Sequence, residues 1–181
     1  AVKDTMDTLA NITPEQLVEL DARFVWHPFT PMRQWIAEGD RPGCVIANAE
    51  GFELIDTRGR RFIDGFSSLW CNLHGHRVKE IDSAITERLG RVAHTTLLGH
   101  ASGPSIELAS RLVQITPPGL EKVFYSDSGS AAVEIALKIA FQYFRNISQP
   151  SRQKFIALRS GYHGDTIGSV SLGGIGTFHG I

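Results

Sequence analysis

Apolar residues recur at helical spacing from residue 78 onward, which predicts three helices. The first apolar series consists of Val78, Ile81, Ile85 and Leu89. A second, less regular series occupies residues 106–113 and ends before the Pro-Pro-Gly at 117–119. The third predicted helix runs from about residue 130 to residue 144 and carries one narrow polar stripe. We therefore expect most of its circumference to be buried.

The region from residue 43 to 66 shows a different pattern, because apolar and polar residues alternate there. Turn signals at Gly51 and Gly59 divide this alternation, which predicts a small antiparallel meander. Further upstream, Thr13 and Gln16 form a capping-box pattern around an early proline, as is typical of a helix start. The sequence therefore predicts a short helix and a small antiparallel lobe before the three longer helices.

Short β-prone runs at 122–126 and 154–158 flank the third predicted helix. A strand, a helix and a second strand in this order predict a βαβ unit with a parallel, right-handed crossover. The expected fold class is α/β, an open and mostly parallel sheet with flanking helices and the small amino-terminal antiparallel lobe. We assign residues 1–75 to the amino-terminal segment with the lobe, and residues 76–181 to the first part of a larger domain.

The composition is that of a folded chain, since 42% of the 181 residues are hydrophobic. Eighteen basic and nineteen acidic side chains leave a formal net charge of -1, so no basic surface is expected for nucleic acid or an anionic membrane. No apolar run approaches the roughly 20 residues that span a bilayer, and the first residues lack a signal-peptide pattern. These features favour a cytoplasmic protein with a small-molecule or protein partner, in which Cys44 and Cys71 are reduced thiols.

The sequence Ser-Asp-Ser-Gly-Ser at 126–130 joins the first strand of the βαβ unit to its helix. The free amides at a helix start and the positive end of the helix dipole attract an anion. Ser128, Gly129 and Ser130 add two hydroxyls and a backbone without a side chain, which suits a phosphate group. An ordinary serine cap followed by a turn glycine would show the same pattern.

The sequence Gly-Tyr-His-Gly-Asp at 161–165 follows the second strand, so it is expected at the same carboxyl edge of the sheet. Tyr162 would bring an aromatic face to the anion pocket, His163 an imidazole and Asp165 a carboxylate. A flat phosphorylated ligand would suit this combination. In the alternative interpretation, Tyr162 is a rim aromatic and Asp165 caps the next turn.

Four longer motifs now follow one another along the chain, namely WHPFTPM, SSLWCNLHGHR, YSDSGSAAVEIALKIA and SGYHGDTIGSVSLGG. With them, nearly the whole chain resembles the class III, fold type I pyridoxal-phosphate aminotransferases, and within these the diaminopelargonate aminotransferases of biotin synthesis. The resemblance implies a fold type I transferase with pyridoxal 5'-phosphate as cofactor and no metal. It also implies a homodimer with the active site near the subunit interface.

The resemblance assigns roles to individual residues. The implied cofactor-binding residues are Ser128, Gly129, Ser130, Tyr162 and His163. The implied substrate-binding residues are Phe29, Trp70, Tyr162 and Asp165. Trp70 would form a wall of the substrate pocket, since a broad indole face suits a long aliphatic acid. A core tryptophan is the alternative for that position.

The reaction implied by the resemblance transfers an amino group to a keto acid, 8-amino-7-oxononanoate, and yields 7,8-diaminononanoate. Phe29 stands where relatives that use adenosylmethionine usually carry tyrosine. Without that hydroxyl, the amino donor is left open between adenosylmethionine and lysine.

No catalytic residue is assigned within the chain. Pyridoxal chemistry requires a lysine that binds the cofactor covalently. The five lysines are Lys3, Lys79, Lys122, Lys138 and Lys154, and they all fall away from the expected ligand-binding edge. In the resembled family this lysine follows further along the chain. We therefore expect the 181 residues to be the amino-terminal part of a longer enzyme and to be inactive alone.

Three other functions are compatible with parts of the sequence. The chain could belong to another class III aminotransferase that acts on an omega-amino acid. The imidazoles of His74 and His76, with His94 and His100 available, could instead hold zinc in a metal-dependent hydrolase. A non-catalytic piece that supplies a subunit interface is the third option, because the apolar helix at 130–144 needs a covering surface.

Overall fold

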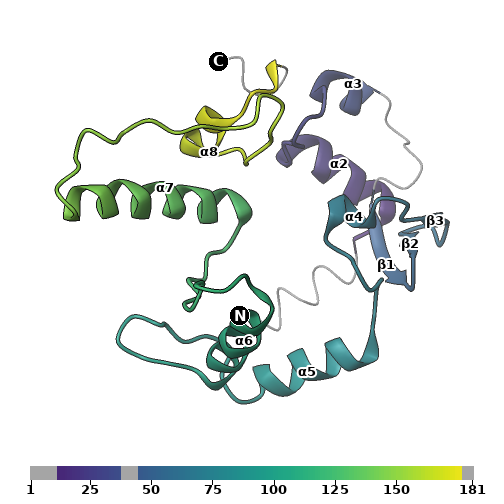
Figure 1. Cartoon of the computed structure of the whole chain (residues 1–181). Helices are drawn as coiled ribbons and strands as arrows, with labels where there is room; N and C mark the ends of the chain where they lie inside the picture. Colours follow the sequence, from purple (N-terminus) through teal and green to yellow (C-terminus); the bar gives the residue numbers. More distant parts are fainter. Residues whose placement is uncertain (1–11, 38–44, 177–181) are drawn as a thin grey trace. The chain divides into compact units, whose positions relative to one another are not determined.

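The computed structural model describes residues 12–37 and 45–176 (Figure 1). The chain divides into two compact units, Ala1–Thr95 and Thr96–Ile181. The boundary that we expect at residue 75 concerns the larger domain of the implied fold, so it stays a prediction. Among the described residues, no helix is long and apolar enough to cross a membrane.

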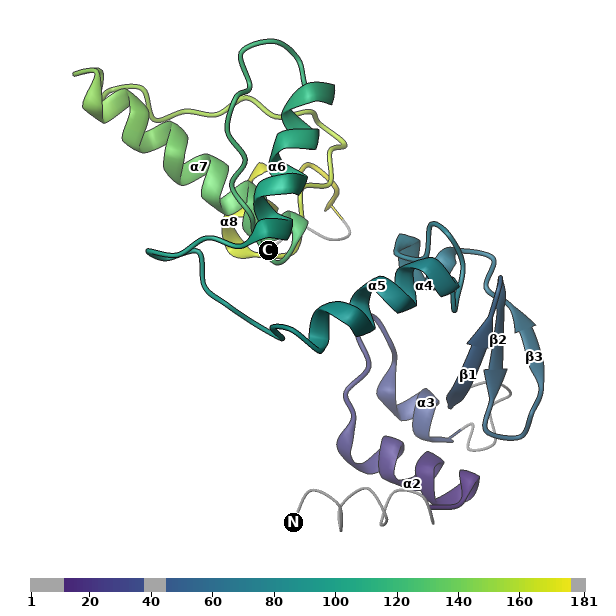
Figure 2. The ribbon, with the colours of Figure 1, turned by 90° about the horizontal axis from the view of Figure 1, so that it is seen from below.

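The first unit combines short helices with a small antiparallel sheet (Figure 2). Its elements are α2 (Pro14–Phe24), α3 (Met32–Ala37), β1 (Ile46–Glu50), β2 (Glu53–Asp56), β3 (Arg61–Ile63), α4 (Ser67–Trp70) and α5 (Lys79–Leu89). The predicted capping box starts α2, because the Gln16 amide donates to the Thr13 hydroxyl at 3.2 Å and the Thr13 amide to the Gln16 side chain at 2.8 Å. The predicted helix start is thus confirmed. The helix α5 confirms the first of the three longer helices predicted from the sequence.

The sheet has the strand order β1-β2-β3, with antiparallel pairing throughout, which confirms the predicted meander. Asp56 closes the turn between β2 and β3, since its carboxylate accepts from the amides of Arg58 at 3.0 Å and Arg60 at 2.8 Å. The Arg60 guanidinium adds a bond of 2.6 Å. Burial by itself would raise the pKa of Asp56, but these bonds hold the pKa below its ordinary value.

The second unit contains α6 (Gly103–Ile115), α7 (Gly129–Asn146) and α8 (Ile167–Leu172), and so confirms the other two predicted helices. The connection from the end of α7 runs back along that helix and leads into α8 near the start of α7 (Figures 1 and 2). The ring of Phe155 in this connection meets the ring of Phe141 on α7 edge to face, with centroids 5.0 Å apart. This return path places the residues before α8 close to the first turn of α7.

Two local expectations are not met within the described residues. The runs at 122–126 and 154–158 are not hydrogen-bonded strands there, because a strand requires a neighbouring strand and none pairs with them. Nor is α7 buried around most of its circumference, as Ile139 is 57% exposed and Tyr143 is 56% exposed. Ile156 is fully exposed as well.

Candidate active site

The first turn of α7 is built by the Ser-Asp-Ser-Gly-Ser sequence. Ser128 is the N-cap, with extended backbone, and its hydroxyl accepts from the Ala131 amide at 3.1 Å. Among the described residues, nothing accepts from the amides of Gly129 and Ser130. At the start of an 18-residue helix these two amides form part of the positive end of the helix dipole. The turn is therefore both a capped helix start and a potential anion site.

The two predicted motifs meet at Ser130. The Asp165 amide donates to the Ser130 hydroxyl at 3.0 Å, although the two residues are 35 positions apart. Gly164 is buried, has φ +124° and lies so close that a Cβ on it would overlap the Ser130 side chain. The hydroxyl of Ser130 accepts this bond and keeps its own proton, which it can donate to a second group. The expected convergence of the two motifs is thus observed.

Glu134, one turn further along α7, holds the start of α8. Its carboxylate accepts from the Gly168 amide at 2.7 Å. Bonds from the Thr166 side chain, from Gly168 and from the Ser169 amide keep the pKa of Glu134 below its ordinary value, although burial opposes this. The N-cap of α8, Thr166, makes no capping bond with its own side chain, so a carboxylate from another helix caps α8. The loop 161–165 immediately before α8 is consequently tied to α7 at two points.

Sequence reasoning missed the role of Glu134, which the helical spacing assigns to the solvated polar stripe of α7. A signal is present in retrospect. Glu134 is the stripe residue nearest the helix start, and its neighbours in AAVEIA are small or apolar. Spacing along one helix, however, contains no information about a partner on another helix.

The side chains of the 161–165 loop form a small polar network. The Tyr162 hydroxyl donates to the Asp165 carboxylate in a short hydrogen bond, which raises the pKa of Tyr162 above its ordinary value. Tyr162 is 50% exposed, so a face of its ring is accessible to a ligand. The Nε2 atom of His163 is buried and has no hydrogen-bond partner among the described residues, and a Cβ on Gly161 would lie 2.7 Å from it. The loop that contacts Ser130 through Asp165 thus also carries a half-exposed aromatic ring and a buried imidazole nitrogen.

Phe29 and Trp70, the other predicted substrate-binding residues, belong to the first unit. Phe29 is 82% exposed and Trp70 is 80% exposed. Trp70 ends a run of four residues, Ser67 to Trp70, whose φ values of 54°, 47°, 63° and 69° are all in the left-handed region. Left-handed geometry costs a residue other than glycine roughly 1–2 kcal/mol. Within the part of the chain that the structure describes, Trp70 is therefore an exposed residue on a strained turn.

The histidines proposed as zinc ligands do not form a metal site in the part of the chain that the structure describes, where no three His, Cys, Asp or Glu converge. The imidazole of His76 instead meets Asp64, with Nε2 2.9 Å from the carboxylate. Cys71 is an exposed free thiol, and Cys44 lies outside the described residues. Residues 12–37 and 45–176 therefore offer the zinc-hydrolase interpretation no ligand set.

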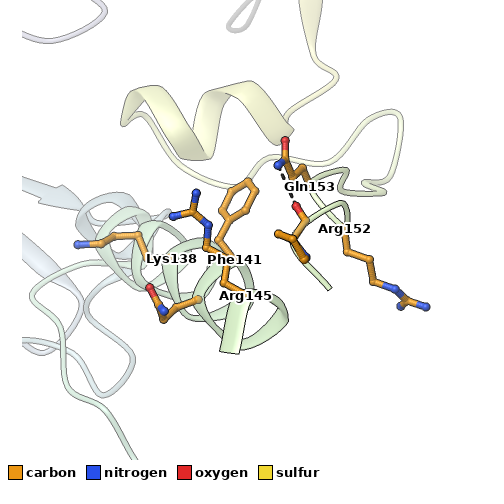
Figure 3. A pocket seen from close by; sticks show the side chains of 7 residues that line it. Lys138, Phe141, Arg145, Arg152 and Gln153 are labelled. Atoms are coloured by element: carbon orange, nitrogen blue, oxygen red, sulfur yellow. Dashed lines mark hydrogen bonds between the residues drawn. The ribbon is translucent and has the colours of Figure 1, made fainter. Parts of the chain in front are cut away.

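A pocket of about 420 Å³ lies on the carboxyl-terminal half of α7, away from the Ser128 turn (Figure 3). It is lined by Lys138, Phe141, Gln142, Arg145, Pro150, Arg152 and Gln153. None of the residues predicted from the sequence to bind cofactor or substrate lines it. We therefore place the candidate active site at the α7 start and the 161–165 loop.

Comparison with known proteins identifies the family. Residues 36–178 match the family described as "Aminotransferase class-III". An adenosylmethionine-8-amino-7-oxononanoate aminotransferase of Nitratidesulfovibrio vulgaris is 60% identical over 168 residues, which cover 92% of this chain and 30% of that protein. The crystal structure of the enzyme of the same name from Methanocaldococcus jannaschii superimposes with a TM-score of 0.85 at 46% identity, over 91% of this chain and 37% of that one.

A second solved structure widens the comparison. An (S)-enantioselective omega-transaminase from Thermomicrobium roseum matches 92% of this chain and 37% of its own length, at 35% identity and a TM-score of 0.84. The chain thus spans about a third of the length of the proteins it matches. The fold class is that of the fold type I pyridoxal-phosphate transferases, as expected. Within that class, the chain belongs to the class III aminotransferase family.

Proposed function

We propose that the protein carrying this chain is a pyridoxal-phosphate aminotransferase that converts 8-amino-7-oxononanoate to 7,8-diaminononanoate. The observation that carries the proposal is the junction of Ser130 with Asp165 at the first turn of α7. It joins the two motifs that would bind a phosphorylated ring. The substrate is proposed from the 60% identity to an aminotransferase named for that compound.

The residues present fit the cofactor. The amides of Gly129 and Ser130, together with the Ser130 hydroxyl proton, would donate to the phosphate. The half-exposed ring of Tyr162 would lie against the flat pyridine. The imidazole of His163 in the same loop has a buried Nε2 with no hydrogen-bond partner among the described residues. When bound, pyridoxal phosphate supplies an electron sink that lets an amino group move between donor and acceptor. The chain's own contribution at this site is binding and orientation.

The substrate-binding residues would act through shape and polarity. Trp70 would offer an apolar wall to the aliphatic chain of the keto acid, and Phe29 an apolar surface near the amino donor. The Asp165 carboxylate would hold the Tyr162 ring in place through their hydrogen bond. We propose that the lysine and the acidic partner that complete the chemistry lie outside these residues, since none of Lys79, Lys122, Lys138 and Lys154 belongs to the 126–130 turn or the 161–165 loop. The exposed apolar surface of α7 supports a homodimer with the site near its interface.

Half-reactions of the complete protein test the function. The pyridoxal form should lose its absorbance band when it is mixed with adenosylmethionine or with lysine. Phe29 cannot donate the hydrogen bond that a tyrosine would, so a donor that relies on that bond should lose on the order of 1 kcal/mol. We therefore expect lysine to react at least as well as adenosylmethionine. The aminated form should then recover its original spectrum on addition of 8-amino-7-oxononanoate.

Recovery with a simple omega-keto acid but not with 8-amino-7-oxononanoate would instead favour the omega-transaminase alternative, which the 35% identical structure supports. Rapid reaction with adenosylmethionine and none with lysine would refute the expected donor preference. As a control, borohydride reduction of the pyridoxal form should attach the cofactor to a lysine outside residues 1–181. Stoichiometric attachment to Lys138 or another lysine of this chain would contradict the proposed position of the catalytic lysine.

The variant Ser130→Ala is expected to weaken cofactor binding. It removes the hydroxyl that accepts from Asp165 and that would donate to the phosphate, at a cost of about 0.5–1.5 kcal/mol for a neutral bond and more for a charge-assisted one. A cofactor titration of the complete protein measures the loss. Ser110→Ala is the matched control, because among the described residues the Ser110 hydroxyl bonds only to the Glu107 carbonyl of its own helix. Equal affinities for both variants would show that the turn is only a helix cap.

A further inference from the structure

The left-handed turn at Ser67–Trp70 requires an external support. Four successive residues other than glycine share the left-handed φ region, and Ser68 and Leu69 also have the matching ψ values of 53° and 55°. Such residues visit this region singly, not in series, so surrounding contacts must stabilise the turn. The turn closes with i to i−4 bonds, in which the Trp70 amide donates to Phe66 and the Cys71 amide to Ser67, both at 2.9 Å.

The support is the Asp64 carboxylate. It accepts from the Ser68 amide at 2.7 Å, from the Ser68 hydroxyl at 2.8 Å and from His76 Nε2 at 2.9 Å. The Asp64 side chain is only 3% exposed, so these donors replace the water that the charge has lost. With its proton on Nε2, His76 can accept from the Asn72 amide group through Nδ1, 3.3 Å away. The bonds from Ser68 and the contact with His76 hold the pKa of Asp64 below its ordinary value.

Both supporting residues are anchored to the small sheet. The backbone of His76 pairs with Gly51, at the turn between β1 and β2, through bonds of 2.6 and 3.1 Å. The Asp64 amide donates to the Phe52 carbonyl of the same turn at 2.8 Å. Gly75 makes the backbone approach possible, since a Cβ there would lie 2.6 Å from the Gly51 oxygen. The sheet thus fixes the carboxylate and the imidazole, which in turn fix the left-handed turn.

We propose that Asp64 and His76 are positioning residues that hold the left-handed turn and so set the direction in which Trp70 faces the keto acid. The inference rests on the proposed function, in which Trp70 lines the substrate pocket. In this proposal Asp64 and His76 support the Ser67–Trp70 turn and do not touch the reactants. Their loss should therefore act on substrate affinity and leave the cofactor site, which belongs to the other unit, unaffected.

A double-mutant cycle in the complete protein tests the proposal. Asp64→Asn removes the charged acceptor, and Leu69→Gly removes the need for support at one position, because glycine adopts the left-handed region without strain. The Leu69 side chain is apolar and 60% exposed. Leu69→Ala is the control, because it removes most of this side chain without adding the backbone freedom of glycine. Two quantities are measured: the KM for the keto acid, and the hydrogen exchange of the Trp70 and Cys71 amides.

Asp64→Asn alone should raise the KM and the exchange rate about tenfold, with kcat and cofactor affinity within about twofold of the wild type. In the Leu69→Gly background the same substitution should have an effect of about threefold or less, whereas Leu69→Ala should leave it at about tenfold. An equal effect in the glycine and alanine backgrounds would overturn the proposal. The proposal would also be overturned if Asp64→Asn lowered the affinity for the keto acid, kcat and the cofactor affinity to the same extent. Unchanged hydrogen exchange in Asp64→Asn would overturn it as well.

If Asp64→Asn does not fold, His76→Gln serves in the same cycle, because it alters one of the three donors and keeps the backbone pairing with Gly51. The two readouts also separate the two hypotheses. A wild-type protein that does not accept the keto acid would refute the proposed function, while the exchange measurement would still decide whether Asp64 holds the turn.

Discussion

Replacing Gly164 by alanine is expected to destabilise the complete protein by about 2–4 kcal/mol, the largest loss that we predict for a single methyl group. The added Cβ would overlap the side chain of Ser130, and φ +124° is unfavourable for any residue with a Cβ. Backbone must move, because Ser130 is fixed in the first turn of α7. We therefore expect the 161–165 loop to shift away from the helix and cofactor binding to weaken as well.

The free energy of unfolding of Gly164→Ala is best compared with that of Gly103→Ala. Gly103 starts α6, has no atom within 4 Å of its added Cβ and has no positive φ in this structure. Its replacement by alanine should be neutral or slightly stabilising, because alanine reduces the entropy of the unfolded chain. If the two variants were equally stable, the close contact between Gly164 and Ser130 would not exist in the protein.

Replacing Glu134 by alanine should release the start of α8 and lower cofactor affinity roughly tenfold, since several donors of the α8 start lose their shared acceptor. Glu134→Gln should have a smaller effect, because the amide oxygen can still accept while the charge is lost. The matched control is Glu107→Ala on α6, where the carboxylate makes an exposed ion pair with Arg111 at 2.6 Å. Cofactor titrations of the three variants rank these losses.

The pH dependence of this cap has a definite sign. The pKa of Glu134 is lowered in the folded protein, so its contribution to stability is complete above the ordinary pKa of glutamate and is lost as the pH falls through the lowered value. The stability difference between wild type and Glu134→Gln should therefore be constant near neutral pH and narrow in acid. A difference that grew as the pH fell would contradict the capping role.

The sequence predicted well those features of the fold that depend on residues close together along the chain. The helix start at Thr13, the α5, α6 and α7 helices and the meander from β1 to β3 follow from spacing, caps and turn signals, which involve residues only a few positions apart. The approach of the two motifs was predictable too, because a βαβ path returns the chain to the same edge. Their hydrogen bond is present even though the runs at 122–126 and 154–158 have no strand partner among the described residues.

By itself, the sequence determined the helices α2, α5, α6 and α7, the small sheet and the family motifs at 126–130 and 161–165. Only the tertiary structure decided that Glu134 caps α8 from 34 positions away and that His76 meets Asp64 across 12. The left-handed turn before Trp70 was likewise invisible, since nothing in Ser-Ser-Leu-Trp favours that backbone region. The reason is physical: periodicity reports which face of an element is apolar, whereas a polar side chain takes the partner that folding brings within hydrogen-bond distance.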